Sequence, residues 1–131
     1  MDIKKEFGTD KTLENEGVWQ DIGDGARVLV ARINNKAYSD ELKRLSVPHK
    51  IAIRNDRLSD EVWLQILIEV TAKTLLLGWS GIEYDGKPLP YSTDNAMKIL
   101  TEFKDFRDSI SGLATSMELF KQNEKAAAIK N

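Results

Sequence analysis

The sequence predicts a mainly α fold, in which one small helical domain carries an N-terminal β-hairpin packed on it. Two observations favour helices. A long apolar stripe at helical spacing begins after Ser59, and apolar residues recur every three or four positions over 99–120. The third observation predicts the hairpin, because Asp24-Gly25 lies between two apolar runs. A chain of 131 residues can bury such a core without disulfides, and this one has no cysteine.

Composition divides the chain into three segments. Residues 1–17 are polar and predict a flexible N-terminal arm. Residues 18–123 predict a single helical domain that includes the hairpin, because the apolar patterns fall within them. Residues 124–131 lack such a pattern, and we expect a frayed C-terminal tail.

The N-terminal part of the domain predicts a hairpin followed by a short helix. The hairpin covers residues 18–33, and Gly23-Asp24-Gly25 supplies its turn. Asn34-Asn35 then caps a helix over residues 36–45, whose apolar positions share one helical face.

The segment after this helix predicts a loop. Pro48 ends the helix, and residues 46–58 contain an apolar island at residues 51–53 with little periodicity around it. We expect this loop to be either mobile or ordered by a partner.

The next helix is predicted to be central. Ser59 is a good N-cap, and Asp60 and Glu61 suit the positive end of the helix dipole. The helix is apolar on more than one side, which predicts that other elements cover it. Its apolar run continues to Leu77, and Gly78 is placed to end it.

A connector and a further helical region follow. Asp85-Gly86 predicts a turn, Pro88 and Pro90 hold the chain extended, and Ser92 caps the next helix. Thr101 is expected to break that helix and to cap its second piece. The apolar positions form a heptad-like seam, which consists of Ile99, Phe103, Phe106, Ile110, Leu113, Met117 and Phe120. Two interpretations remain open: the seam packs on the chain's own core, or it pairs with a partner's helix.

The sequence contains no recognisable catalytic signature. His49 is the single histidine and lies beside a proline, and the absence of cysteine removes thiolate metal sites. Asp21 and Asp24 flank a turn and are better explained by turn geometry than by cation binding. We therefore predict a non-enzyme without metal or cofactor, in which the three tryptophans anchor the core.

The charges are unevenly distributed along the chain. The net charge of −2 argues against a general nucleic-acid binder, and no apolar run is long enough to span a membrane. From Arg27 to Arg57 there are eight lysines and arginines against three acidic residues, whereas from Leu58 to Asn95 there are two against six. These segments are either ordinary solvated surface or opposite faces through which subunits meet.

Residues 75–101 resemble a run found in the tail assembly chaperones of long-tailed bacteriophages. The shared order is a Trp after a long helix, a Gly, a D-G-K-P-like turn, then Pro, an aromatic residue, Ser, and N-A opening the next helix. The likeness extends over residues 18–111, because the G-D-G-A turn and the F-R-D-S-I helix also occupy family-like places.

This resemblance implies a function. Such chaperones bind the tape measure protein and keep it soluble before the tail tube polymerises around it. They self-associate, a longer frameshifted product recruits the tail tube protein, and they act in the host cytoplasm without remaining in the mature virion. We expect partner or oligomer contacts at six residues, Arg54, Arg57, Ile110, Leu113, Met117 and Phe120.

Two other classes of function remain open from sequence. One is a small adaptor or regulatory protein that binds a host protein or nucleic acid, for which affinity for nucleic acid would fall steeply with salt. The other is a minor structural subunit of the tail or connector, which would be present in purified virions.

Overall fold

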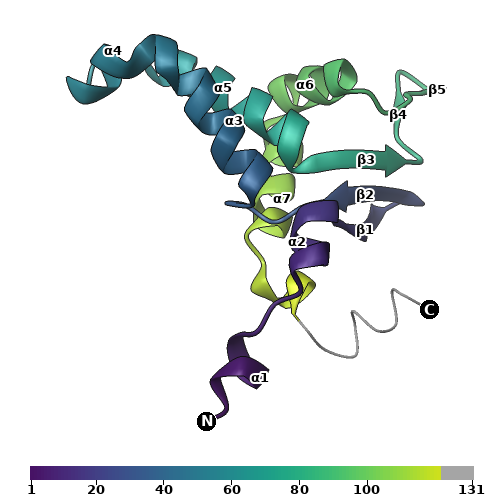
Figure 1. The fold of residues 1–131 in the computed structure, drawn as a ribbon. Coiled ribbons are helices and arrows are strands. Elements are labelled where there is room, and N and C mark those ends of the chain that lie inside the picture. The colour runs from purple at the N-terminus through teal and green to yellow at the C-terminus, as the bar shows by residue number, and fades with distance from the viewer. Residues whose placement is uncertain (122–131) are drawn as a thin grey trace.

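The computed structural model describes residues 1–121, so the predicted frayed tail at residues 124–131 lies outside the described residues. Three strands form an antiparallel sheet in the order β1-β2-β3: β1 Val18–Gly23, β2 Ala26–Val30 and β3 Leu76–Ser80. Two short strands, β4 Glu83–Tyr84 and β5 Lys87–Pro88, pair with each other beyond β3. Figure 1 shows the sheet on one side of the molecule and the helices extending away from it.

The helical elements within residues 1–121 are short or of moderate length. They are α1 Ile3–Phe7, α2 Lys11–Glu16, α3 Lys36–Ser46, η1 Val47–His49, α4 Lys50–Arg54, α5 Asp60–Thr74, α6 Thr93–Glu102, α7 Lys104–Ala114 and η2 Met117–Phe120. With two sheets beside these helices, the molecule is a mixed α/β domain. The predicted mainly α class is therefore wrong.

The predicted hairpin is confirmed. β1 and β2 pair antiparallel, and Asp24 and Gly25 between them have φ of 51° and 76°. Two left-handed residues are what a tight two-residue hairpin turn requires, and Asp-Gly supplies them at low cost. Val28 and Val30 of β2 are fully buried, so one face of the hairpin packs on the helices as expected.

The third strand is the main feature that the sequence prediction missed. We expected the central helix to continue to Leu77, but α5 ends at Thr74 and β3 begins at Leu76. An unbroken apolar run has no period that separates a helix from a buried strand. Pairing with β2 resolves the ambiguity, and Leu76 becomes fully buried.

The main core lies between the sheet and the helices α5, α6 and α7. Its fully or almost fully buried side chains include Val28, Val30, Ile68, Val70, Leu76, Leu100 and Ile110. Trp79 is buried as expected, but Trp19 is 41 % exposed and Trp63 is 39 % exposed. The prediction that all three tryptophans anchor the core is therefore right only for Trp79.

The seam predicted over residues 99–120 is divided between separate elements. The break falls at Phe103, which has extended φ and ψ of −115° and 96°, and not at Thr101. The Thr101 hydroxyl donates to the Met97 carbonyl oxygen at 2.7 Å inside α6, so it does not cap the second helix. Arg107 instead donates to the Leu100 carbonyl oxygen at 2.6 Å, which satisfies a carbonyl at the end of α6.

Much of the predicted N-terminal arm is packed against the body. Leu13 of α2 is buried in a second cluster with Val18, Leu119 and Phe120. The Asp10 backbone N–H donates to the Phe120 carbonyl oxygen at 2.7 Å, and Thr9 pairs with Lys121. Sequence composition alone missed this packing because the contact joins the two ends of the described chain.

A carboxylate in α2 strengthens the same contact. Glu14 accepts a hydrogen bond from the Thr9 hydroxyl at 2.7 Å and pairs with Arg32 at 3.3 Å. Burial raises the pKa of Glu14, but the Thr9 hydrogen bond and the charges of Lys11 and Arg32 outweigh it, so the pKa is lowered.

The first prediction concerns the buried end of the described chain. We expect Phe120→Ala to lower the free energy of unfolding by about 3–5 kcal/mol, because the fully buried ring leaves a cavity. Phe103→Ala is the matched control; this ring is 44 % exposed, and we expect a loss below about 2 kcal/mol. Urea unfolding followed by circular dichroism measures both. Equal losses would show that Phe120 is not a core residue.

Candidate functional site

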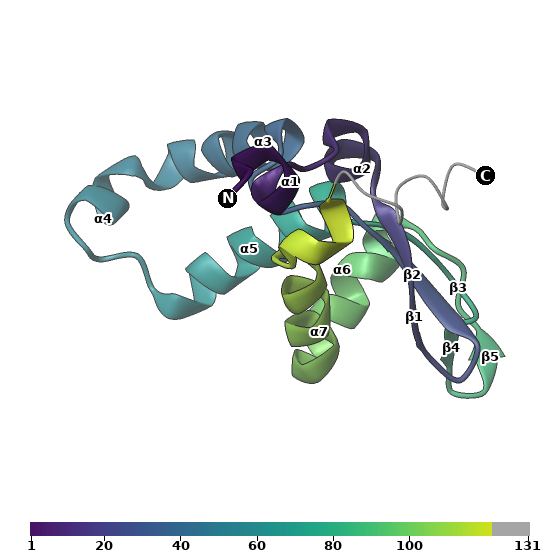
Figure 2. The same ribbon diagram turned by 90° about the horizontal axis from the view of Figure 1, so that it is seen from below.

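Helices α3 and α5 form a finger that projects away from the sheet. They lie side by side and are joined at the far end by η1 and α4 (Figures 1 and 2). The side chain of Asn35 caps α3 by accepting from the Tyr38 N–H, and that of Ser59 caps α5 by accepting from the Val62 N–H, as predicted. We call residues 36–74 the helical finger.

The predicted loop at residues 46–58 is mostly helical. Pro48 lies in the first turn of η1, where a missing N–H costs nothing, so the chain continues directly into α4. The helix ends where Asp56 takes a φ of 53° and the Arg57 N–H donates to the Ala52 carbonyl oxygen at 2.7 Å. Only residues 55–58 of this segment are irregular.

An ion-pair network joins the two helices of the finger. Lys73 of α5 contacts Glu69 at 2.9 Å and reaches Glu41 of α3 at 3.4 Å. Arg44 of α3 pairs with Glu41 and also reaches Glu69 at 3.5 Å. The hydrogen bond from Arg44 lowers the pKa of Glu41, although partial burial opposes this, and the hydrogen bond to Glu69 raises the pKa of Lys73.

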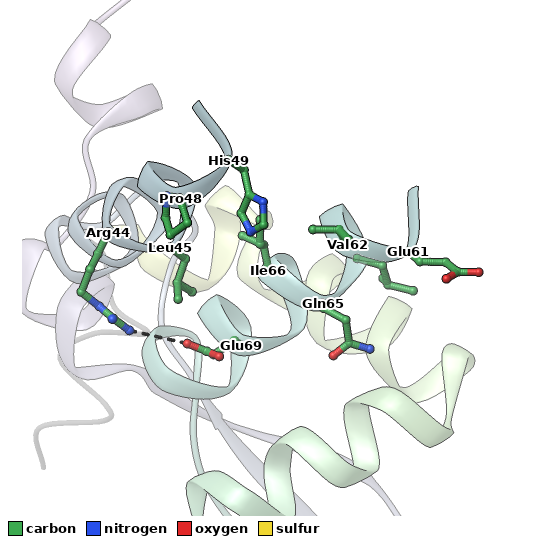
Figure 3. Close-up of a pocket in the computed structure, with 10 residues that line it drawn as sticks. Arg44, Leu45, Pro48, His49, Glu61, Val62, Gln65, Ile66 and Glu69 are labelled. Atoms are coloured by element: carbon green, nitrogen blue, oxygen red, sulfur yellow. Dashed lines mark ion pairs between the residues drawn. The ribbon is translucent and has the colours of Figure 1, made fainter. Parts of the chain in front are cut away.

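An open groove of about 650 Å³ runs between these helices beyond the network. We call it the finger groove; Figure 3 shows its lining, with the Arg44–Glu69 pair at one end and Glu61 at the other. Its apolar residues are Leu45, Pro48, Val62, Leu64 and Ile66, and its polar residues are Arg44, His49, Glu61, Gln65 and Glu69. Leu64 is 38 % exposed, so the groove offers apolar surface to a partner.

The far end of the finger combines exposed apolar and basic side chains. Ile51 is 72 % exposed and Ile53 is 41 % exposed, both on α4. Lys50, Arg54 and Arg57 lie beside them and form no ion pair with any residue in the range 1–121. We call residues 47–57 the finger tip.

The structure does not bring the six predicted contact residues together. Arg54 and Arg57 are exposed at the finger tip, whereas the other four lie in or near the body. Ile110 and Phe120 are fully buried, and Leu113 and Met117 are half-buried. These side chains of the seam therefore pack on the chain's own core, which was one of the two interpretations left open by the sequence. The sequence signal for this region was the apolar island at residues 51–53, whereas the exposed Trp63 and Leu64 were expected to pack in a covered helix.

The connector segment at residues 75–101 has a structural role. The Trp79 indole N–H donates to the Leu89 carbonyl oxygen at 2.8 Å, and the Tyr91 hydroxyl donates to the Leu76 carbonyl oxygen at 2.7 Å. The two rings meet edge to face with centroids 5.1 Å apart. Asn95 adds a hydrogen bond to the Pro90 carbonyl oxygen at 2.9 Å. These residues therefore hold the connector against β3.

The residues considered for chemistry are explained by local contacts. Asp21 pairs with Arg27 at 3.2 Å across the hairpin, and Asp24 forms the turn. Within residues 1–121, no three or more histidine, cysteine or acidic residues are grouped to hold a metal ion. The same residues contain no helix that is both long and apolar enough to cross a membrane.

The second prediction concerns the network at the base of the finger groove. Because the folded-state pKa of Glu41 lies below its ordinary value of 4.5, its stabilising contribution is complete above that pH and is lost as pH falls through the folded pKa. We expect Glu41→Gln to lower the free energy of unfolding at pH 7 by up to about 1 kcal/mol, since the pair is partly solvated. The difference from the unmodified chain should vanish in acid.

Asp40→Asn is the matched control, because within residues 1–121 Asp40 forms an ion pair only with Lys36 on the same exposed helix face. Urea unfolding of the three proteins at neutral and acid pH makes the comparison. A Glu41→Gln effect that stays constant across that range would contradict the ionic origin.

Comparison with known proteins gives a single line of evidence. Residues 33–131 match the model of a family described as "YdaY prophage protein". No curated protein and no solved structure matches the chain. The family match starts after β2 and includes the whole helical finger, β3 and the connector. Because the match covers well over half of the sequence, the chain belongs to the YdaY prophage protein family.

Proposed function

We propose that this prophage protein is a tail assembly chaperone that binds and solubilises the tape measure protein before the tail tube polymerises, without catalysis. Membership of a prophage family supports a phage role, and the resemblance over residues 18–111 supports this particular one. The observation that carries the proposal is the finger groove, an apolar groove between two helices that opens to solvent.

The groove has the chemistry that an amphipathic helix needs. The partner helix would place its apolar side chains on Leu45, Pro48 and Leu64, while its polar face remains in water. Arg44 and Glu69 lie at one end, where charged side chains of the partner can pair. A long helical partner offers this apolar face repeatedly, so many modest and reversible contacts keep it soluble.

The groove replaces the seam as the expected contact surface. Ile110 and Phe120 are committed to the core and would have to leave it in order to bind a partner. In the proposed role, tube subunits are recruited by a longer frameshifted product. The chaperone works in the host cytoplasm and is absent from the finished virion.

The third prediction tests binding of the tape measure protein. The chain is co-expressed with the product of the longest reading frame downstream in the same prophage, and complexes are captured and weighed by light scattering. We expect a soluble complex with several copies of this chain per partner. Leu64→Asp should reduce recovery of the complex by about tenfold or more, because it removes apolar contact and places a charge in the groove.

Ile3→Asp is the matched control, since Ile3 is 66 % exposed on α1 and lies outside the groove. Thermal melting confirms that both variants fold. A partner that stays insoluble with the unmodified chain would reject the chaperone role. Retention of the chain in purified virions would favour a structural subunit.

A further inference from the structure

A second groove lies at the end of the molecule opposite the finger tip. It has a volume of about 640 Å³ and is formed by the turn of the β-hairpin, by β4 and by the junction of α6 and α7. Ile22 and Phe103 expose 39 % and 44 % of their surface there, and Tyr84 and Phe106 add aromatic surface. We call it the acidic groove.

Five carboxylates line this apolar surface, and no lysine or arginine is among its lining residues. They are Asp24, Glu83, Asp85, Glu102 and Asp105. None of the five forms an ion pair with another residue of the described chain. Glu102 accepts a hydrogen bond from the Tyr84 hydroxyl at 2.8 Å, which together with nearby negative charge raises the pKa of Tyr84.

Lys98 is a basic side chain close to this region. Its ammonium lies 4.4 Å from the centroid of the Tyr84 ring, and it forms no ion pair within residues 1–121. The lining of the groove itself carries five carboxylates and no cation. The acidic groove therefore favours a partner that is both apolar and positively charged.

The finger tip has the complementary character. It presents Ile51 and Ile53 together with the unpaired cations Lys50, Arg54 and Arg57. We infer that the finger tip of one copy binds the acidic groove of a second copy, so that copies of this chain associate head to tail. The two isoleucines would cover the aromatic surface of the groove, and the cations would face its carboxylates.

The contact must be made between copies. Figures 1 and 2 both place α4 and the β4–β5 pair at opposite ends of the molecule, so one chain cannot close the contact on itself. A contact between two different surfaces can repeat from copy to copy, which gives an open chain or a ring. Ile51, Ile53, Arg54 and Arg57 are not among the lining residues of the finger groove.

The acidic groove does not coincide with the acidic segment 58–95 that the sequence shows. Of the acidic segment 58–95, only Glu83 and Asp85 line the acidic groove, while Asp60 and Glu61 lie on the finger itself. The remaining groove carboxylates come from the hairpin turn and from the α6–α7 junction. The acidic groove therefore gathers carboxylates from distant parts of the sequence, so the acidic surface of the folded chain differs from the acidic segment 58–95.

The fourth prediction tests this contact with the purified chain alone, so it does not depend on tape measure binding. At low ionic strength, light scattering should show a mass that grows with concentration. Arg54→Glu with Arg57→Glu should weaken association by about tenfold or more, because like charges would then meet in the groove. Glu83→Lys with Asp105→Lys should weaken it equally from the other side.

Rescue distinguishes this contact from a general charge effect. Mixing the two double variants should restore association in pairs, because the unmodified finger tip of one variant then meets the unmodified acidic groove of the other. Lys4→Glu with Lys5→Glu on α1 is the charge-matched control and should leave association unchanged.

Three outcomes would overturn the inference. The first is an unmodified chain that stays monomeric at every concentration in low salt. The second is an oligomer whose mass neither double variant changes. The third is a mixture of the two double variants that fails to associate. Circular dichroism checks that every variant folds, which is expected because all the substituted residues are exposed.

Discussion

The pairing of β2 with β3 is the interaction on which the rest of the structure depends. β2 lies between β1 and β3, so its backbone groups are satisfied on both sides only if residues after α5 become extended. This pairing ends α5 at Thr74 and also fixes where the finger begins. The Ala31 N–H donates to the Leu75 carbonyl oxygen at 2.8 Å, and the Asn35 side chain reaches the Thr74 carbonyl oxygen at 3.4 Å. The start of α3 and the end of α5 are therefore tied together at the sheet, which directs the finger away from it.

Charged side chains are paired near the sheet and unpaired at the two ends of the molecule. Near the sheet, the two finger helices are joined by the network of Glu41, Arg44, Glu69 and Lys73. Such pairs neutralise one another and contribute modestly to stability. At the finger tip, Lys50, Arg54 and Arg57 outnumber Asp56, and the acidic groove is lined by carboxylates; none of these charges has an ion-pair partner inside residues 1–121. Like charges that lie close together repel one another. An oppositely charged partner would relieve this repulsion at the finger tip and in the acidic groove, whereas the charges of the network are already paired.

Local signals in the sequence predicted local structure well. Asp24-Gly25 gave the hairpin turn, and Asn35, Ser59 and Ser92 cap three helices through side-chain hydrogen bonds. Each of these motifs acts within a few residues, so the chain around it contains all the information needed.

The features that the sequence prediction missed depend on distant contacts. β3 requires β2, which lies more than forty residues earlier, and α2 packs because Phe120 lies beneath it. The seam at residues 99–120 had a real period, but a period shows which side chains are buried and not what buries them. The six predicted contact residues were chosen partly from that seam, and Ile110 and Phe120 are consequently in the core.

The exposed apolar residues of the helical finger were hard to predict from periodicity, because helical spacing of apolar residues is the signal of a buried face. Among residues 1–121, five of the eleven exposed large apolar side chains lie on the helical finger: Val47, Ile51, Ile53, Trp63 and Leu64. Scattered exposed apolar residues are ordinary, but a concentration on one projecting element marks an interaction surface. The finger contributes little to the main core at its far end, so packing within the chain does not explain these residues. In the proposed association a second copy covers Ile51 and Ile53, and the neighbouring cations favour an acidic surface on that copy.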